Sequence, residues 1–388
     1  MGYSAVMPFR QFILKIHSRC DLACDYCYVY TMADQRWRSQ PKVMSSQTME
    51  LTARRIAEHA ASHRLHAVDA VLHGGEPLLA GPKRITRLAR LIRDAAPPGV
   101  EVGLRLQTNG LRLDRDLIRL LADLGIRVGV SLDGGPEHND LHRRRRDGAG
   151  SYAGVRRALL ALTGGAGREI FAGLLCTIDV RNDPVATYEA LLEFDPPAIE
   201  FQLPHANWSN PPPARVPGSP ATPYADWLIA VFERWYGAAR KETRVRIFEE
   251  IINLLLGGYS CVEGFGLGPV SCVVVQTDGA IEQTDMLGSA YEGAAVTGLH
   301  VERNSFDEAA GSPGIVVRRS GADALARTCR ECDLLRVCGG GSYWHRYRAG
   351  SGFVNPSVYC PDLYRLIGHI RGRLAADVDR LRASRGMR

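Results

Sequence analysis

The feature that most constrains the fold is an alternation of short apolar runs with longer amphipathic stretches over the first 200 of 388 residues. The apolar runs, which predict strands, are 12–17, 70–73, 101–107, 127–132, 170–178 and 199–203. The stretches with helical period are 46–63, 83–95, 114–124, 153–162 and 184–193. Repeated strand–helix units predict a parallel sheet with right-handed crossovers. Six such strands favour a partial (β/α)6 barrel of the TIM type, and an open doubly wound sheet is the alternative.

The amino-acid composition changes after residue 203 and divides the chain into parts. Residues 204–223 hold 7 of the 21 prolines, which indicates a loop, and two amphipathic helices are expected at 224–236 and 245–256. From Gly257 the sequence turns to Gly, Cys and short strands, with a β-hairpin at 273–283 around Asp278-Gly279. We therefore expect three parts: a barrel at 1–204, a bridging part at 205–256 and a cysteine-rich part at 257–388 that ends in an amphipathic helix.

Composition excludes several classes of protein. No apolar run approaches the length that crosses a bilayer, and the N-terminus lacks the pattern of a signal peptide, so the sequence predicts a cytoplasmic protein without a membrane partner. The net charge of +6 comes from 44 Arg and 4 Lys against 42 acidic residues. The dense basic run is confined to 143–146, and we expect no nucleic-acid partner.

Ten cysteines form two clusters, one near each end of the chain. The first, CDLACDYC, places Cys20, Cys24 and Cys27 directly after the first predicted strand, where barrel enzymes carry their chemistry. Three thiolates at this spacing suit a [4Fe–4S] cluster with three irons bound by cysteine and one iron open. A structural zinc ion, with His17 as fourth ligand, is the alternative, but zinc usually takes cysteines in C-x2-C pairs.

Polar motifs follow the next three predicted strands in order. His73-Gly74-Gly75-Glu76-Pro77 ends the second strand, Gln107-Thr108-Asn109-Gly110 the third, and Val130-Ser131-Leu132-Asp133-Gly134 the fourth, with His142-Arg143 beyond. With the cysteine loop, they resemble the radical S-adenosylmethionine (SAM) superfamily. The resemblance implies a SAM site, and the residues expected to form it are Tyr26, Gly74, Gly75, Glu76, Gln107, Asn109, Ser131, Asp133 and Arg143. Arg144, Arg145 and Arg146 are expected to be solvated or to face a peptide.

The second cluster contains Cys329, Cys332, Cys338 and Cys360. Its C-x2-C-x5-C core indicates a metal site, and spacing alone leaves zinc and iron–sulfur open. The region resembles the SPASM extension of peptide-modifying radical SAM enzymes, which implies that these four cysteines bind one auxiliary [4Fe–4S] cluster.

The sequence departs from that pattern at a second auxiliary cluster. Thr284 and Ser342 stand where the family has cysteine, and only Cys261 and Cys272 remain nearby, so we expect two clusters in all. Cys176, inside a predicted strand, is expected to be a buried small hydrophobe.

Asp285 follows Thr284, and related sulfatase-maturing enzymes have a catalytic base at this position. The resemblance implies the same role here, and an exposed hairpin aspartate is the alternative. His205, Trp208, Trp344 and His345 are further candidates for the cavity, with packing as the simpler interpretation.

The whole chain resembles the FxsB-type radical SAM/SPASM peptide maturases, on the strings CDLACDYCYVY, HGGEPLL, FQLPHANWSNPP, TDGAIEQTDML and CGGGSYWHRY. This implies an oxidoreductase that modifies a ribosomally made precursor peptide. The expected product is a cyclophane, a carbon–carbon bond from an aromatic ring to the β-carbon of a nearby residue. The expected partners are the precursor peptide and an electron donor such as flavodoxin or ferredoxin.

Three alternatives remain at this point: formylglycine formation in a sulfatase, a thioether crosslink, and a non-enzymatic zinc protein that binds RNA through its arginines. No segment has the extra length of an appended leader-binding domain. We therefore expect the barrel mouth and the 204–223 loop to recognise the peptide.

Overall fold

A computed structural model describes residues 7–216, 219–260 and 262–386. Its centre is one ten-stranded sheet with the order β10-β9-β8-β1-β2-β3-β4-β5-β6-β7. The strands are β1 Gln11–His17, β2 Ala67–Gly74, β3 Glu101–Thr108, β4 Ile126–Ser131, β5 Phe171–Thr177, β6 Ala198–Gln202, β7 Arg244–Val245, β8 Cys272–Val275, β9 Ala280–Glu282 and β10 Val296–His300. Strands β1 to β7 lie in sequence order and are all parallel. This order has no reversal point, so it is that of a partial barrel and excludes a doubly wound sheet.

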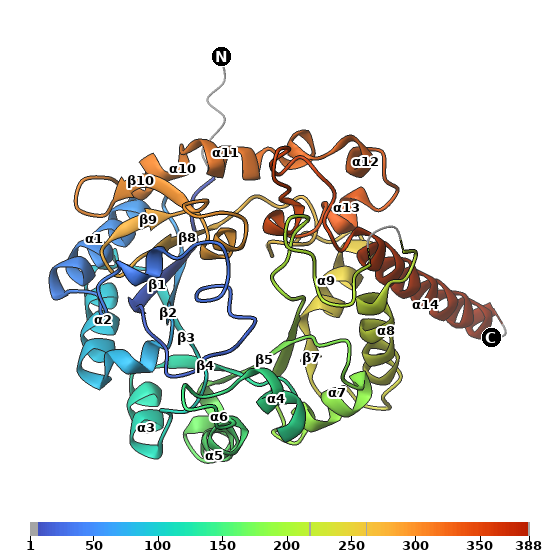
Figure 1. Cartoon of the computed structure of the whole chain (residues 1–388), viewed down its shortest axis with the longest axis horizontal. Helices are drawn as coiled ribbons and strands as arrows, with labels where there is room; N and C mark the ends of the chain where they lie inside the picture. The colour runs from blue at the N-terminus through green and yellow to red at the C-terminus, as the bar shows by residue number, and fades with distance from the viewer. Residues whose placement is uncertain (1–6, 217–218, 261, 387–388) are drawn as a thin grey trace.

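Helices cover the outside of the curved sheet, and Figure 1 shows α1, α2, α3, α5, α7 and α8 around it. The helices are α1 Ser46–Ser62, α2 Pro82–Ala95, α3 Arg115–Asp123, α4 Pro136–His142, α5 Tyr152–Leu162, α6 Gly167–Ile170, α7 Pro184–Leu192, α8 Pro223–Tyr236, α9 Arg246–Leu255, α10 Phe306–Ala310, α11 Pro313–Arg319, α12 Arg327–Arg330, α13 Leu335–Cys338 and α14 Cys360–Gly386. Short 3-10 turns lie at Arg36–Arg38, Pro77–Ala80, Asp285–Ser289, Gly321–Ala324 and Tyr343–Arg346. Side-chain caps fix the first turns of α1 and α3. The Ser45 side chain accepts a hydrogen bond from the Thr48 amide, and the Asp114 side chain accepts one from the Leu117 amide.

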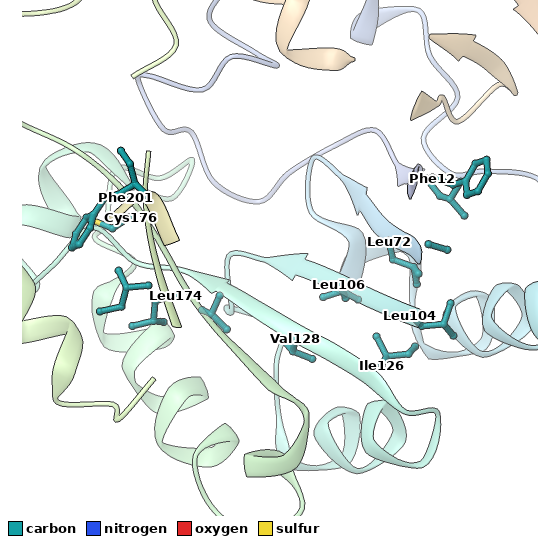
Figure 2. Packing of buried hydrophobic residues seen from close by; sticks show 14 of the residues in the cluster. Phe12, Leu72, Leu104, Leu106, Ile126, Val128, Leu174, Cys176 and Phe201 are labelled. Atoms are coloured by element: carbon teal, nitrogen blue, oxygen red, sulfur yellow. The ribbon is translucent and has the colours of Figure 1, made fainter. Parts of the chain in front are cut away.

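The core lies between the sheet and these helices. Figure 2 shows Leu104 and Leu106 of β3 beside Ile126 and Val128 of β4, and all four are at most 2% exposed. Alternate residues of each strand point this way. Cys176 is 1% exposed within this core, as its place in a strand predicted.

The cysteine-rich part continues the barrel sheet. β8 pairs in parallel with β1, from Gln11 opposite Cys272 to Leu14 opposite Val275, and β9 and β10 follow antiparallel. The predicted hairpin is therefore present, and it adds strands to the edge of the barrel. The six predicted barrel strands are β1 to β6. Two further parallel strands, β7 and β8, were not predicted as part of the barrel.

The C-terminal helix α14 packs against α8 and α9 and then extends away from the body of the molecule (Figure 1). Leu363, Leu366, Ile367 and Ile370 of its predicted apolar side are buried, and Leu374 packs against the same core. Among the described residues, the structure has no helix that is both long enough and apolar enough to span a membrane.

Candidate active site

The candidate site lies at the ends of neighbouring parallel strands. The loop after β1 holds the three cysteines, and the ends of β2, β3 and β4 hold the polar motifs predicted from the sequence. Because the carboxyl ends of parallel strands meet on one face of a barrel, these motifs are brought together there. The turn after β9 reaches the same place and adds Asp285.

The cysteine loop carries three buried thiols. Burial raises the pKa of Cys20 to about 12 and that of Cys24 to about 11, and it raises that of Cys27 as well. The Cys20 sulfur accepts from the Leu22 amide at 3.4 Å and from Asn109 Nδ2 at 3.6 Å. Thiols with such pKa values stay protonated unless a metal binds them, and amide donors near sulfur are typical of iron–sulfur sites.

Gly74 and Gly75 form a turn where only glycine fits. A Cβ on Gly74 would lie 2.1 Å from the His17 carbonyl oxygen, and one on Gly75 would lie 1.9 Å from Tyr30 Oη. The Gly75 amide also donates to His17 O at 2.8 Å. The absence of side chains therefore lets β2 close against the start of the cysteine loop and leaves bare backbone facing the site.

Glu76 supports this turn from inside the protein. Its Oε1 accepts from the Leu78 amide and from Thr108 Oγ1, and its Oε2 accepts from the Asn109 amide. Burial raises its pKa to about 7, although these hydrogen bonds act against the shift. Both carboxylate oxygens are engaged, so Glu76 joins the ends of β2 and β3.

Gln107, Asn109 and Ser131 line the adjacent strand ends. Gln107 Nε2 donates to Ser131 Oγ at 2.9 Å, and Asn109 Nδ2 donates to Asp21 Oδ1 at 2.8 Å. These bonds connect the ends of β3 and β4 to the cysteine loop.

Tyr26, Asp133 and Arg143 form a buried network under the cysteine loop. The Tyr26 hydroxyl donates to Asp133 and accepts from Arg143 Nη1 at 2.9 Å. Asp133 also accepts from the Thr177 amide at 2.9 Å. Arg143 Nε is buried and has no hydrogen-bond partner. A buried guanidinium with a free N–H is ready for an anionic ligand such as a carboxylate.

Asp285 lies inside the barrel, so the exposed-hairpin alternative is wrong. Its Oδ2 accepts from Lys15 Nζ and, at 2.6 Å, from the Tyr28 hydroxyl. Burial on its own would raise the pKa of Asp285. The charge of Lys15 and the two hydrogen bonds outweigh burial and hold this pKa well below its usual range. Asp285 is therefore a fixed carboxylate.

Lys15 and His73 are functional candidates that sequence reasoning missed. Lys15, in the middle of β1, is 4% exposed, and its Nζ lies 3.1 Å from His73 Nδ1. Burial and the charge of Lys15 lower the pKa of His73 to about 4, so this imidazole is neutral. The sequence did contain a signal for Lys15, because a lysine inside an apolar strand needs a buried anion as its partner.

A cavity that is partly open to solvent lies beside this ion pair. Lys15, Tyr28 and Asp285 line its inner end together with Gly74 and Gly75. Arg36, Trp37 and Gln40 line it from the segment after the cysteine loop, and Glu282 lines it from β9. Arg36 is held by Asp34 and by Glu282 at 2.7 Å. The cavity thus joins the glycine turn to Asp285.

The four C-terminal cysteines gather at the start of α14. Burial raises the pKa of Cys360, and the nearby Cys329 and Cys332 thiols raise it further. Burial likewise raises the pKa of Cys338 to about 12, with Cys360 and Cys329 adding to the shift.

A tetrahedral zinc ion with Zn–S bonds of about 2.3 Å would hold its sulfurs less than about 4 Å apart. In the part of the chain that the structure describes, no three cysteine sulfurs lie within 4.8 Å of one another. The four thiols are therefore not arranged as a closed tetrahedral zinc site.

At the position of the second auxiliary cluster the structure has polar side chains. Thr284 is fully buried, and Cys272 lies near a buried ion pair of Arg318 with Glu263 at 2.5 Å. A Cβ on Gly264 would lie 2.9 Å from Ser342 Oγ, so this space is filled. Cys261 lies outside the described residues. A second auxiliary cluster would need ligands at positions 261, 272, 284 and 342. Among the described positions of this set, only Cys272 offers a thiol.

The remaining candidates separate into buried and exposed groups. His205, Trp344 and His345 are at most 9% exposed. Trp208 is 37% exposed, and its Nε1 donates to the Pro356 carbonyl. Arg144, Arg145 and Arg146 are exposed, and Arg146 Nε donates to the Cys20 carbonyl at 3.1 Å.

Fold and site together define a barrel enzyme with a three-cysteine centre at the strand ends and a separate four-cysteine group. Residues 14–173 match the model of the radical SAM superfamily. This match gives the chain a radical SAM domain, and sulfatase-maturating enzymes are among the proteins that it is similar to. It is 25% identical to the serine-type anaerobic sulfatase-maturating enzyme of Klebsiella aerogenes, over 98% of this chain and 90% of that one. It is 26% identical to a cysteine-type enzyme of Clostridium perfringens, over 72% and 74%.

Solved structures confirm the fold. Native anSMEcpe with bound AdoMet superposes with a TM-score of 0.80 at 20% identity, covering 96% of this chain and 99% of that one. Streptococcus suis SuiB bound to its precursor peptide SuiA gives a TM-score of 0.57 at 14% identity, covering 91% and 76%.

Proposed function

We propose that this protein is a peptide maturase that forms a carbon–carbon cyclophane crosslink in a ribosomally made precursor peptide. The observation that carries the proposal is the Lys15–Asp285 ion pair on the wall of the cavity beside the glycine turn. The barrel (1–204), the bridging part (205–256) and the cysteine-rich part (257–388) would then supply the radical, the covering helices and the electron acceptor.

The cofactor assignments follow from the donor sets. Cys20, Cys24 and Cys27 would hold a [4Fe–4S] cluster with one open iron, and Cys329, Cys332, Cys338 and Cys360 an auxiliary one. The buried free N–H of Arg143 suits the carboxylate of SAM, and the bare turn at Gly74 and Gly75 suits its amine. Tyr26, Gln107, Asn109, Ser131 and Asp133 would complete the SAM site, with Glu76 shaping it. When bound, cluster and SAM supply a 5′-deoxyadenosyl radical that abstracts hydrogen from an unactivated carbon.

The side chains of the cavity then determine what becomes of the substrate radical. Addition of a β-carbon radical to an aromatic ring gives a species that must lose one electron and one ring proton. That proton is strongly acidic once the electron has gone, so it needs a nearby acceptor rather than a strong base. Asp285, held as a carboxylate by Lys15 and Tyr28, is such an acceptor. Trp37 and Arg36, which line the cavity, would hold the peptide at its entrance.

Formylglycine formation is the second candidate, and the sulfatase-maturating relatives favour it. That reaction removes a proton from a serine hydroxyl or a cysteine thiol, whose ordinary pKa is about 8.5 or higher. General-base catalysis works best when the pKa of the base lies near the operating pH. A carboxylate whose pKa is held well below its usual range is poorly matched to a thiol or hydroxyl, and it is suited to the ring proton.

The test is to incubate reconstituted enzyme, SAM and reductant with two peptides. One peptide contains an aromatic residue with an aliphatic residue two positions on, and the other contains a sulfatase serine or cysteine motif. A crosslink and a serine-derived formylglycine both remove two hydrogens, so tandem mass spectrometry and hydrazide labelling must separate them. We expect a hydrazide-negative product of the aromatic peptide whose fragmentation is blocked between the crosslinked residues. An aldehyde in the sulfatase peptide alone would support the second candidate.

A further inference from the structure

A row of aromatic rings runs through the protein interior between the two cysteine groups. Its ring centroids are 4.5 Å apart from Tyr28 to His205, 6.0 Å from His205 to Trp344, 5.4 Å from Trp344 to His345 and 4.8 Å from His345 to Tyr359. The five residues come from three distant parts of the chain. Their contact is therefore a product of the tertiary fold.

The two ends of the row are adjacent to cysteines. Tyr28 directly follows Cys27 in the sequence and lines the cavity, where its hydroxyl donates to Asp285. Tyr359 directly precedes Cys360 and is fully buried. The row thus begins at the cavity and the three-cysteine loop and ends at the four-cysteine group.

The middle of the row is buried and uncharged. His205 is 9%, Trp344 5% and His345 3% exposed. His205 Nδ1, Trp344 Nε1 and His345 Nε2 are buried and have no hydrogen-bond partner. Burial lowers the pKa of His205 to about 4, so the ring is neutral. Three polar atoms left unpaired in series cost stability, and this arrangement calls for a reason beyond packing.

We propose that Tyr28, His205, Trp344, His345 and Tyr359 form the electron path between the three-cysteine and four-cysteine sites. The inference rests on the cluster assignment of the proposed function. In the crosslinking reaction, the substrate radical loses one electron to the four-cysteine site and its ring proton to Asp285. The electron that SAM cleavage consumed is thereby recovered within the protein. The rings shorten each gap that the electron tunnels across, and no ring has to be oxidised.

The path can be tested without a peptide. Both clusters are reduced with dithionite, the excess is removed, and SAM is added. The first equivalent of 5′-deoxyadenosine uses the electron of the three-cysteine site. A second equivalent requires an electron from the four-cysteine site, and freeze-quench EPR follows the loss of that site's reduced signal. We expect wild-type protein to show this second phase, Trp344→Leu to lose it, and Trp344→Phe to retain it.

Trp227→Leu is the matched control, because Trp227 is 3% exposed and its ring packs on Phe201 outside the row. It should keep the second phase. If Trp344→Leu does not retain its iron, His205→Leu against His205→Phe makes the same comparison one ring earlier. An unchanged EPR decay in the leucine variant, an equal loss in Trp227→Leu, or a wild type without a second phase would each overturn the path. Iron content and the separate EPR signals test the cluster assignment independently.

Discussion

Lys15 and Asp285 form an ion pair inside the barrel although 270 positions separate them in the chain. Lys15 comes from the middle of β1, and Asp285 follows the β9 strand of the cysteine-rich part. The pair fixes a carboxylate at the inner end of the cavity and so decides its protonation state. It also makes the barrel and the cysteine-rich part jointly responsible for the proposed proton acceptor.

Replacing Asp285 with asparagine should separate radical formation from crosslinking. Asn keeps the size of the side chain and removes the basic oxygen. SAM cleavage and transfer of deuterium from a β-labelled peptide to 5′-deoxyadenosine should continue. Crosslinked product should fall by about a hundredfold or more. Asp323→Asn, at an exposed position of the same part of the chain, is the control. Undiminished crosslinking by Asp285→Asn would remove the acid–base role, and a loss of iron would instead make Asp285 a ligand.

Lys15→Gln should make crosslinking sensitive to acid. In the wild type, Lys15 holds the pKa of Asp285 well below its usual range, so the carboxylate stays ionised at any pH near neutral. Without the charge, burial prevails and raises this pKa. The variant should therefore lose crosslinking as the pH falls through the raised pKa, whereas the wild type should not. The measurement is the pH profile of product formation, with exposed Lys42→Gln as control. Parallel profiles for Lys15→Gln and the wild type would contradict the assigned role.

Changing Cys20, Cys24 and Cys27 together to alanine should abolish 5′-deoxyadenosine formation. The four distant cysteines are untouched, so iron and an EPR signal from the auxiliary site should persist. Persistent SAM cleavage by this variant would show that the assignment is incorrect. The reciprocal Cys332→Ala variant should lose auxiliary iron and keep SAM binding.

Reconstituted wild-type protein should contain about eight iron and eight sulfide per chain, as expected for two [4Fe–4S] clusters. The reason is the filled space around Thr284, Ser342 and the Arg318–Glu263 pair, where a second auxiliary cluster would need ligands. Iron and sulfide analysis with Mössbauer spectroscopy measures this directly. A content near about twelve would require a third cluster.

Gly75→Ala should damage the SAM site. The added methyl would lie 1.9 Å from Tyr30 Oη and 2.5 Å from the Arg19 carbonyl, and the backbone atom has little room to move. We expect a loss of about 1–3 kcal/mol in unfolding free energy and weaker SAM binding, measured by denaturation and calorimetry. Gly368→Ala, where a Cβ meets no atom within 4 Å, should be neutral or slightly stabilising. Equal behaviour of the two variants would refute the steric argument.

Much of the barrel could be predicted because each strand carries its own signal. The six apolar runs, the caps at Ser45 and Asp114, and the motifs at the strand ends are local patterns, and parallel strands bring their ends together automatically. The two-residue strand β7 was missed because it is too short to show a period, and its second residue had been included in the following helix.

The missed parts of the site depend on contacts between distant segments. Lys15 lies in a run that reads as a plain apolar strand, and its partner belongs to another part of the chain. The ring row joins residues 28, 205, 344, 345 and 359, whose positions follow no common pattern. Sequence reasoning gave packing as the simpler role for His205, Trp344 and His345. Only their arrangement in space distinguishes a continuous row from ordinary core residues.

The pairing of β8 with β1 has a consequence for how the protein can be divided. β1 is central only because β8 covers its free side, from Gln11 to Leu14. A fragment that ended before residue 257 would expose the unpaired amides and carbonyls of an apolar edge strand, which is a template for aggregation. It would also leave Lys15 as a buried charge without its anion. The barrel alone is therefore a poor expression fragment, and exchange of the cysteine-rich part between relatives must preserve the register of β8 on β1.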